Sequence, residues 1–264
     1  MVITLKVDGL GFYYHRDKEI LKDISFQLNE HEVLCLLGPN GTGKTTMLRC
    51  ILSLNKIKKG TIEIDGVDFT KTSARKRAEI MAYVPQATTM TFPYKSFEIV
   101  LMGRVAHLAT GCSPTDKDKA IAKEAMEKLG IVYLIHKDFN QMSGGEKQMI
   151  LVARALAQQS KILIMDEPTA NLDYSNQVRM LQLIKNLAEE GYSILMASHF
   201  PDHAFLACNK VALMRDGVIM AQGYPDNIVT TENLTALYQT PVCVTEAELS
   251  LKSSTIKVCV PVME

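Results

Sequence analysis

Eight consecutive residues have the types and the spacing that bind phosphate. They are Gly38, Pro39, Asn40, Gly41, Thr42, Gly43, Lys44 and Thr45, with Thr46 directly after them. The run fits the pattern G-x-x-x-x-G-K-[ST], whose glycines let the backbone fold round an anion so that successive N–H groups point at phosphate oxygens. We expect Lys44 to bridge the β- and γ-phosphates of a nucleotide and the Thr45 hydroxyl to bind Mg²⁺. The alternative is a glycine-rich turn that contains a lysine by chance.

The flanks of this loop favour nucleotide binding over a chance turn. The apolar run Val33–Leu37 leads into the loop, and a helical pattern follows Lys44. A strand, a loop and a helix in this order aim the helix N-terminus, with its unpaired amides and the positive end of its dipole, at the phosphates. The sequence therefore predicts a nucleotide site here.

Two adjacent acids end another apolar run. Residues 162–165 are apolar, and Asp166, Glu167 and Pro168 follow them. A buried strand tolerates carboxylates at its end, where a metal ion or water pairs with them, and open α/β sheets bind ligands at those ends. We expect Asp166 to hold Mg²⁺ through its hydration shell and Glu167 to polarise the attacking water as general base. The alternative is that both acids cap the element after Pro168.

A serine and two glycines form a third candidate anion site. Ser143, Gly144, Gly145 and Glu146 precede a helical pattern with an apolar face. Free amides at such a helix start bind anions, and the serine also caps the helix. Because Ser-Gly-Gly is a common turn as well, this motif indicates an anion site only in combination with the phosphate loop and the two adjacent acids.

An α/β scaffold is needed to position these residues, and the sequence predicts one. Short apolar runs alternate with helical patterns, which is typical of an α/β protein with a largely parallel, buried sheet. Strands are predicted at Ile3–Val7, Ile20–Leu28, Val33–Leu37, Thr61–Asp65, Met81–Val84, Lys161–Met165, Ser193–Ser198, Val211–Met214 and Val218–Ala221. Helices are predicted after Lys44 and at Asp116–Leu129, Gly145–Gln158, Ser175–Glu190 and Thr231–Tyr238. Asp216-Gly217 predicts a hairpin, and the weakly patterned tail after Thr245 predicts one strand at Thr255–Val260.

The composition is that of an ordinary globular protein. The chain has 264 residues, 29 Lys and Arg against 29 Asp and Glu, 47% apolar and 22% charged residues, and no Trp. These fractions exclude a disordered or collagen-like chain, and the zero net charge removes the positive field that nucleic-acid binding needs. No apolar run approaches the roughly 20 residues of a membrane span, and residues 1–8 lack the basic start and unbroken apolar stretch that a secretory signal is expected to have. The dispersed cysteines, as reduced thiols, favour a soluble cytosolic protein: Cys35, Cys50, Cys112, Cys208, Cys243 and Cys259.

The three motifs resemble, over about residues 1–225, those of the nucleotide-binding subunit of an ABC (ATP-binding cassette) transporter. Met142–Glu146 is similar to the LSGGQ signature of that family, with Met in place of Leu and Glu in place of Gln. The first change conserves volume, and the second is a known variant of the family. Tyr14 resembles the aromatic residue that stacks on adenine, with Tyr13 as the competing choice.

Three more positions match elements of the family. Gln86 resembles the Q-loop glutamine, which contacts Mg²⁺ and the side that faces the permease. Asp173 matches the D-loop, although Ala170-Asn171 stands there in place of the usual Ser-Ala. His199 matches the switch histidine that reaches the γ-phosphate. The resemblance thus implies a catalytic set of Gln86, Glu167 and His199, with Mg²⁺ held by Thr45, Gln86 and Asp166.

The resemblance also implies a fold, two ligands and a dimer. The fold is a P-loop NTPase core with a mainly parallel sheet, an N-terminal antiparallel β subdomain and a helical subdomain inserted at about 88–158. The cassette would occupy residues 1–243 and a short extension residues 244–264. The ligands are ATP and Mg²⁺. Two copies would pack head to tail, so that Ser143, Gly144 and Gly145 of one close over ATP on the phosphate loop of the other.

Two segments resemble the ATPases of metal-chelate importers, which carry iron-siderophore, haem, cobalamin or molybdate/tungstate-type cargo. They are Phe97–Arg104 and Glu232–Tyr238, the second followed by Pro241-Val242. The alternative for the first is that Val100 and its neighbours form a core face of the helical subdomain. The resemblance implies separate integral membrane permease subunits, an extracytoplasmic substrate-binding protein as an indirect partner, and no nucleic acid.

The resemblance to importer ATPases implies that the chain lies at the cytoplasmic face of the plasma membrane, attached through the permease. Three alternatives stay open. They are an ABC ATPase of another transporter class, an ABC ATPase that drives no transport, and a P-loop nucleotide kinase. The last would not need a dimer or Ser143-Gly144-Gly145 for turnover.

Overall fold

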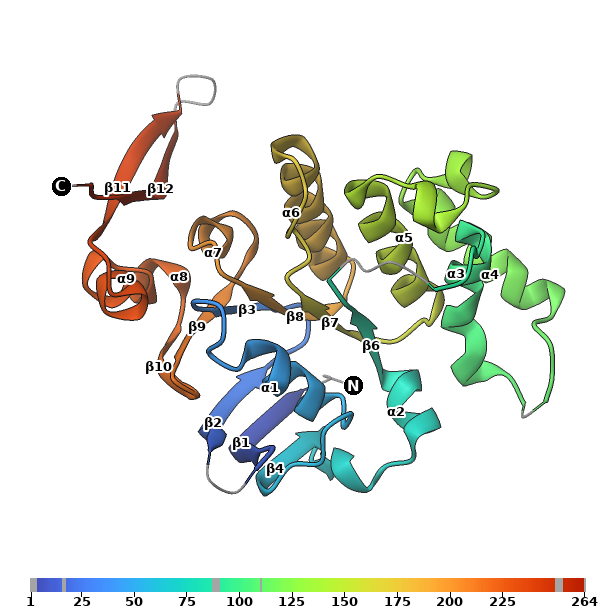
Figure 1. The fold of residues 1–264 in the computed structure, drawn as a ribbon, viewed down its shortest axis with the longest axis horizontal. Helices are drawn as coiled ribbons and strands as arrows, with labels where there is room; N and C mark the ends of the chain where they lie inside the picture. Colours follow the sequence, from blue (N-terminus) through green and yellow to red (C-terminus); the bar gives the residue numbers. More distant parts are fainter. Residues whose placement is uncertain (1–3, 16–17, 87–90, 110, 250–253, 264) are drawn as a thin grey trace. The chain divides into compact units, whose positions relative to one another are not determined.

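The computed structural model describes residues 4–15, 18–86, 91–109, 111–249 and 254–263 (Figure 1). The chain forms two compact units, a first unit of Met1–Thr70 with Leu181–Glu264 and a second unit of Lys71–Met180. The described residues do not include Ile3 of the predicted first strand, residues 88–90 and 110 of the predicted helical subdomain, or residues 250–253 and 264 of the extension.

An antiparallel sheet in the first unit contains the N-terminal residues. Its strands lie in the order β2-β1-β4-β5. They are β1 (Leu5–Tyr13), β2 (Glu19–Leu28), β4 (Lys59–Ile64) and β5 (Val67–Asp68). The first strand runs beyond the predicted Val7, because Gly9, at φ 60°, forms an irregularity in the register rather than an end.

A second set of strands in this unit is buried and mostly parallel. It has the order β10-β9-β3-β8, formed by β3 (Val33–Leu37), β8 (Ser193–Ser198), β9 (Lys210–Arg215) and β10 (Val218–Gly223). β3 runs parallel to both β8 and β9, and every residue of β3 and β8 is buried, which explains the apolar runs 33–37 and 194–197. β9 and β10 form the hairpin that Asp216-Gly217 predicts. Helices α1 (Lys44–Ile51) and α7 (Asp202–Ala207) follow β3 and β8.

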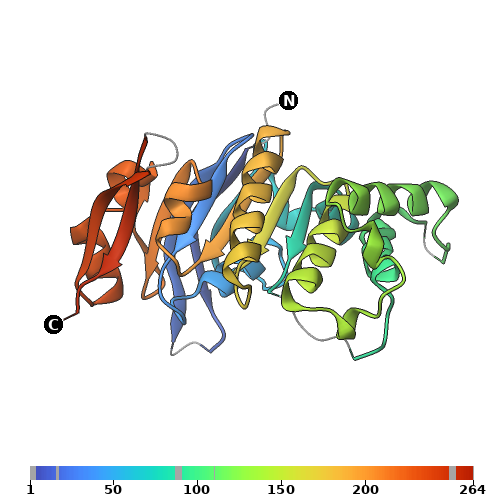
Figure 2. The ribbon, with the colours of Figure 1, turned by 90° about the horizontal axis from the view of Figure 1, so that it is seen from above.

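The C-terminal part of the first unit holds two helices and a hairpin, drawn in red shades in Figures 1 and 2. These are α8 (Pro225–Ile228), α9 (Thr231–Tyr238) and the antiparallel pair β11 (Val242–Leu249) and β12 (Ser254–Pro261). The predicted strand Thr255–Val260 is confirmed as part of β12, but the tail also holds β11, which was not predicted. Both faces of β11 mix apolar and polar residues, so its sequence shows no clear alternation of apolar and polar positions.

The second unit is mainly helical around two parallel strands, β6 (Met81–Val84) and β7 (Ile162–Asp166). Its helices are α2 (Ala74–Ile80), α3 (Ser96–Leu101), α4 (Asp116–Lys128), α5 (Gly144–Ala157) and α6 (Tyr174–Glu189), which ends in the first unit. Short 3₁₀ turns complete the chain: η1 (Phe69–Lys71), η2 (Met102–His107), η3 (Val132–Leu134) and η4 (Phe139–Gln141).

Residues of the predicted importer-like segment Phe97–Arg104 pack inside the second unit. Val100 is fully buried, and Arg104 is only 5% exposed. The Arg104 guanidinium donates to a carboxylate oxygen of Asp118 at 3.1 Å and to the carbonyl oxygen of Ala157 at 2.8 Å. A buried cation needs such acceptors. Packing inside the second unit therefore explains much of the sequence of this segment, in agreement with the alternative that Val100 and its neighbours form a core face.

The α/β class and the division into parallel and antiparallel sheets are confirmed. All six cysteines carry free thiols. Within the described ranges, no helix combines the length and the apolar character that crossing a membrane requires. The boundaries 1–243 and 244–264 remain a prediction.

Candidate functional site

The phosphate loop of the first unit lies between β3 and α1. Its first amide, on Gly38, donates to the carbonyl oxygen of Ser198 at 3.2 Å, which ties the loop to β8. Gly43 precedes α1 in a left-handed conformation, at φ 103°, and no side chain of the described residues caps the helix there. The N-terminus of α1, with the positive end of its dipole, is therefore open to an anion.

Lys44 is folded into its own loop. Its side chain is 5% exposed, and Nζ donates to the carbonyl oxygens of Gly38 at 2.6 Å and Pro39 at 2.8 Å. The Thr42 hydroxyl also donates to the Pro39 carbonyl, at 3.0 Å. A buried ammonium thus stands at the start of the helix, within the loop that the motif predicts. This arrangement fits a phosphate ligand, which would offer the ammonium oxygens of opposite charge.

His199 lies at the edge of this loop. It directly follows β8, whose Ser198 pairs with Leu37 across the sheet, so His199 and Gly38 leave neighbouring strands at the same end. The His199 ring lies 4.1 Å from the Phe200 ring, centroid to centroid. Its carbonyl oxygen accepts a hydrogen bond from the Tyr238 hydroxyl at 2.9 Å. The first unit therefore brings His199 and the phosphate loop together.

Tyr13 and Tyr14, the two candidates for stacking on adenine, differ in what their rings contact. Tyr14 is 56% exposed, and its hydroxyl accepts from the Asn55 side-chain amide at 3.3 Å. The Tyr13 ring has the Lys58 ammonium over it, 5.4 Å from the ring centroid. A ring that already faces a cation is the poorer platform for a base, so the geometry favours Tyr14.

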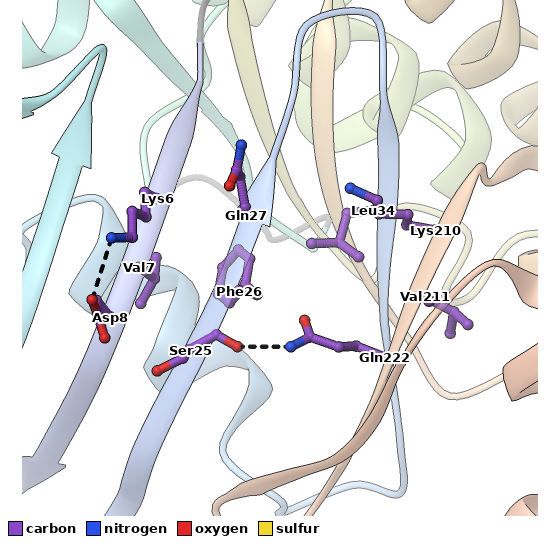
Figure 3. Close-up of a pocket in the computed structure, with 11 residues that line it drawn as sticks. Lys6, Val7, Asp8, Ser25, Phe26, Gln27, Leu34, Lys210, Val211 and Gln222 are labelled. Atoms are coloured by element: carbon purple, nitrogen blue, oxygen red, sulfur yellow. Dashed lines mark hydrogen bonds and ion pairs between the residues drawn. The ribbon is translucent and has the colours of Figure 1, made fainter.

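A pocket of about 430 Å³ in the first unit is a different feature (Figure 3). Residues of β1, β2, β3, β9 and β10 line it, and the Gln222 amide donates to the Ser25 carbonyl oxygen at 3.2 Å. Both lysines that line it have acidic partners: Lys6 pairs with Asp8 at 3.4 Å and Lys210 with Glu32 at 2.8 Å. With its cations engaged and no glycine-rich loop, this pocket is not the phosphate site.

The two predicted acids lie at the end of β7 in the second unit. Asp166 is its last residue, 6% exposed, and accepts a hydrogen bond from the Tyr83 hydroxyl at 3.2 Å. Glu167 follows in a left-handed conformation, at φ 47°. Gln86 comes two residues after β6, which is parallel to β7 with Val84 opposite Met165, so all three leave the sheet at one edge. This edge carries the carboxylates and the amide that the sequence predicts.

The signature motif forms a helix cap in the second unit. Ser143 precedes α5, and its hydroxyl oxygen accepts from the Glu146 amide at 3.2 Å, while a Glu146 carboxylate oxygen accepts from the Ser143 amide at 2.8 Å. The Lys137 ammonium donates to both Glu146 oxygens at 2.8 and 2.9 Å. These hydrogen bonds hold the pKa of Glu146 below its ordinary value, and the bond from Lys137 has the largest effect. They explain physically why a glutamate fits here.

The signature glycines pack against the D-loop region. A Cβ on Gly145 would lie 2.8 Å from the side-chain nitrogen of Asn176, and one on Gly144 would lie 3.1 Å from the Asn171 carbonyl oxygen. Asn176 is in turn held by Asp173, whose carboxylate accepts from its backbone amide at 2.8 Å and its side chain at 3.0 Å. These bonds, the backbone one foremost, lower the pKa of Asp173. The second unit therefore joins the signature and Asp173 through Asn176.

Sequence reasoning missed the residues that support the predicted ones: Tyr83 under Asp166, Lys137 beside Glu146, Asn176 between Asp173 and Gly145, and Tyr238 on His199. Only Asn176 has a sequence signal, because it follows Asp173 by three residues, the spacing of a helix cap. The structure assigns the predicted residues to two groups by unit. The loop 38–46, Tyr14 and His199 belong to the first unit; Gln86, Ser143–Glu146, Asp166, Glu167 and Asp173 belong to the second.

A buried strand, a glycine-rich loop and an uncapped helix with a buried lysine define a P-loop nucleotide-binding protein. Residues 21–170 match the family described as ABC transporter. An uncharacterized ABC transporter ATP-binding protein of Haemophilus influenzae is 37% identical over 239 residues, 90% of each chain. The molybdate import ATP-binding protein MolC of the same organism is 34% identical, over 93% of this chain and 92% of that one.

A solved structure described as a metal-chelate type ABC transporter, inward-facing, is similar with a TM-score of 0.89 and 33% identity, over 100% of this chain and 98% of that one. Other relatives, at 33–34% identity over 86–92% of this chain, are named for iron chelatin in Helicobacter pylori, hemin in Gloeobacter violaceus and cobalamin in Halobacterium salinarum. The chain belongs to the ABC transporter family as an ATP-binding subunit. It binds ATP, and its activity is ATP hydrolysis.

Proposed function

We propose that this ATPase powers the import of a metal chelate or metal oxyanion through a separate membrane permease. The cargo class is iron-siderophore, haem, cobalamin or molybdate/tungstate. One observation carries the proposal: the similarity to the metal-chelate type transporter extends over the whole chain, beyond residues 21–170 of the family match and through the C-terminal hairpin. The relatives named for molybdate, iron chelatin, hemin and cobalamin support the same class.

ATP would be bound by the loop 38–46 and by the ring of Tyr14. The Lys44 ammonium would exchange its bonds to the loop carbonyls for phosphate oxygens, and the open N-terminus of α1 would add its amides. Thr45, Gln86 and Asp166 offer hydroxyl, amide and carboxylate oxygens, the ligands that Mg²⁺ prefers. Mg²⁺, when bound there, would neutralise phosphate charge.

Hydrolysis would depend on Glu167, His199 and Gln86. Glu167 follows the buried end of β7, where it would accept the proton of the attacking water. The His199 imidazole would donate to the γ-phosphate, next to the loop that binds it. Gln86 would orient the water or the metal ligand shell through its amide.

A second copy of the chain would complete each site. Ser143 and Gly144 are exposed. The Ser143 oxygen accepts from the Glu146 amide, and its hydroxyl would turn to donate to a phosphate oxygen. In a head-to-tail dimer, Ser143, Gly144 and Gly145 of one copy would face the phosphates on the other. The permease would hold the dimer at the cytoplasmic face of the plasma membrane and receive cargo from an extracytoplasmic binding protein.

The test combines uptake with recovery of partners. Cells without this gene are complemented with the wild type, E167Q or the control E189Q, which changes an exposed acid at the end of α6. Uptake of radiolabelled molybdate and of a radiolabelled ferric siderophore is then measured, and the tagged chain is purified from membranes. We expect one metal cargo to need the wild type or E189Q, and a multi-span protein to co-purify. If no metal cargo depends on the gene and no such protein co-purifies, the import proposal is wrong, although the ATPase assignment stands.

A further inference from the structure

Two neighbouring carbonyl groups fix the backbone at His199. The Ser198 oxygen accepts from the Gly38 amide at 3.2 Å, and the His199 oxygen accepts from the Tyr238 hydroxyl at 2.9 Å. The first bond comes from the phosphate loop. The second comes from α9, a helix to which the proposed function gives no part in binding or hydrolysing ATP.

Tyr238 is held firmly in its place at the end of α9. The Arg215 guanidinium donates to the carbonyl oxygens of Ala236 at 2.5 Å and Leu237 at 2.9 Å, and Leu237 is fully buried. Burial, with nearby acidic groups, raises the pKa of Tyr238 well above its ordinary value. Its hydroxyl therefore keeps its proton and remains a donor to the His199 carbonyl.

The C-terminal hairpin makes a second contact with the same loop. The amide of Cys259, in β12, donates to a carboxylate oxygen of Asp202 at 2.8 Å. Asp202 is the first residue of α7, three positions after His199. Residues 199–202 are therefore contacted twice by the C-terminal segment, once from α9 and once from β12.

The hairpin and α9 are themselves connected. The amide of Val244, in β11, donates to the Thr231 hydroxyl oxygen at 2.9 Å, and that of Val242 donates to the Thr235 hydroxyl oxygen at 3.3 Å. β11 and β12 pair without a register shift from Val242 to Leu249. The hairpin is therefore hydrogen-bonded both to α9 and to Asp202, and Figures 1 and 2 show α9 beside the hairpin.

We propose that residues 230–249 and 254–261 form a brace that positions His199, with Tyr238 as the positioning residue. Tyr238 contacts the backbone of His199 and belongs to no element of the proposed ATP site, so it would act on the rate of hydrolysis and not on ATP binding. The inference rests on the proposed role of His199. It gives the C-terminal extension a function, because a partner that moved the hairpin would change the ATPase rate.

The main test compares Y238F with the control Y224F in the full-length protein. The first removes only the hydroxyl that donates to His199, and the second removes the hydroxyl of a tyrosine that is 65% exposed. We expect Y238F to lower kcat by about threefold to tenfold, the effect of one neutral hydrogen bond, with KM for ATP unchanged. Y224F should keep both values. A wild-type kcat in Y238F, or a fall explained by the unfolded fraction, overturns the proposal.

Asp202 supplies an independent variant pair. D202A removes the acceptor for the Cys259 amide, whereas D202N keeps an oxygen at that position and removes only the charge. We expect D202A to lower kcat and D202N to restore most of it; equal rates in both contradict the brace. H199A tests the proposed role of His199 separately from the proposed role of Tyr238. If H199A hydrolyses ATP at the wild-type rate, the role of His199 is wrong; if it does not but Y238F does, only the brace is wrong.

Discussion

The carbonyl oxygen of Met214 occupies the space that a Cβ atom on Gly38 would need. The first glycine of the phosphate loop is thus required by close packing against β9, in addition to any contact with phosphate. Gly41 differs: among the described residues, its chain neighbours aside, no heavy atom lies within 4 Å of its Cβ position, and it is its φ of 83° that favours glycine. One sequence motif therefore contains glycines needed for two separate physical reasons.

The first prediction compares G38A with G41A. We expect G38A to lower the free energy of unfolding by about 2–3 kcal/mol, because the backbone of β9 or of the loop must move. G41A should cost only about 1 kcal/mol, the penalty of a left-handed alanine. Urea unfolding without nucleotide measures both values. Equal losses in the two variants would mean that the Met214 contact is not the reason for Gly38.

The second prediction concerns Glu167. We expect E167Q to bind ATP with near-wild-type affinity and to hydrolyse it at least about 100-fold more slowly, because the amide cannot accept the proton of water. The variant should accumulate as an ATP-bound dimer, visible by light scattering after gel filtration. E189Q, at an exposed acid, is the control and should turn over normally. Near-normal turnover in E167Q would count against its role as the base.

The third prediction concerns the hydroxyl of Tyr83, which donates to Asp166 at 3.2 Å. Y83F leaves the ring and removes this support from the proposed metal ligand. We expect the Mg²⁺ concentration for half-maximal ATPase activity to rise by about threefold to tenfold, while the rate at saturating Mg²⁺ falls little. The measurement is a Mg²⁺ titration at fixed ATP. An unchanged midpoint would mean either that Asp166 does not bind Mg²⁺ or that the Tyr83 hydroxyl does not support Asp166.

The sequence predicts the interior of the fold better than its periphery. The strands Val33–Leu37, Met81–Val84 and Ser193–Ser198 occupy the predicted residues, because buried parallel strands are built mainly from consecutive apolar residues. β11 was missed because an exposed hairpin needs no apolar face. Helices of four to seven residues, such as α7 and α8, are too short to establish a period of 3.6.

The candidate site shows a similar limit. Lys44, Asp166 and Ser143 can be predicted because their chemistry is local, each following from a few adjacent residues. Their supports cannot be, since Tyr83 precedes Asp166 by 83 positions and Tyr238 follows His199 by 39. Contacts at such separations depend on how strands and helices pack, which one sequence does not specify by pattern.

The last prediction is a pH dependence of stability that arises from His203. This histidine is 5% exposed, and one of its ring nitrogens lies 2.9 Å from the Ser198 hydroxyl. Burial first, and the charge of His199 second, lower its pKa from 6.5 to about 4. Between these values the unfolded chain binds a proton that the folded chain does not, so the free energy of unfolding rises with pH. Stability is therefore lost as the pH falls from 6.5 toward 4.

The expected contribution of His203 is a loss of about 2 kcal/mol between pH 7 and pH 5, within a larger change from the other titrating groups. H203N lacks a titrating ring, so its own loss over this range should be smaller than that of the wild type by this amount. The control is H31N, because His31 is exposed and its φ of 60° suits asparagine. H31N should keep the wild-type dependence. Urea unfolding at the two pH values decides the matter: parallel losses in all three proteins would show that His203 binds its proton equally well in the folded and unfolded states.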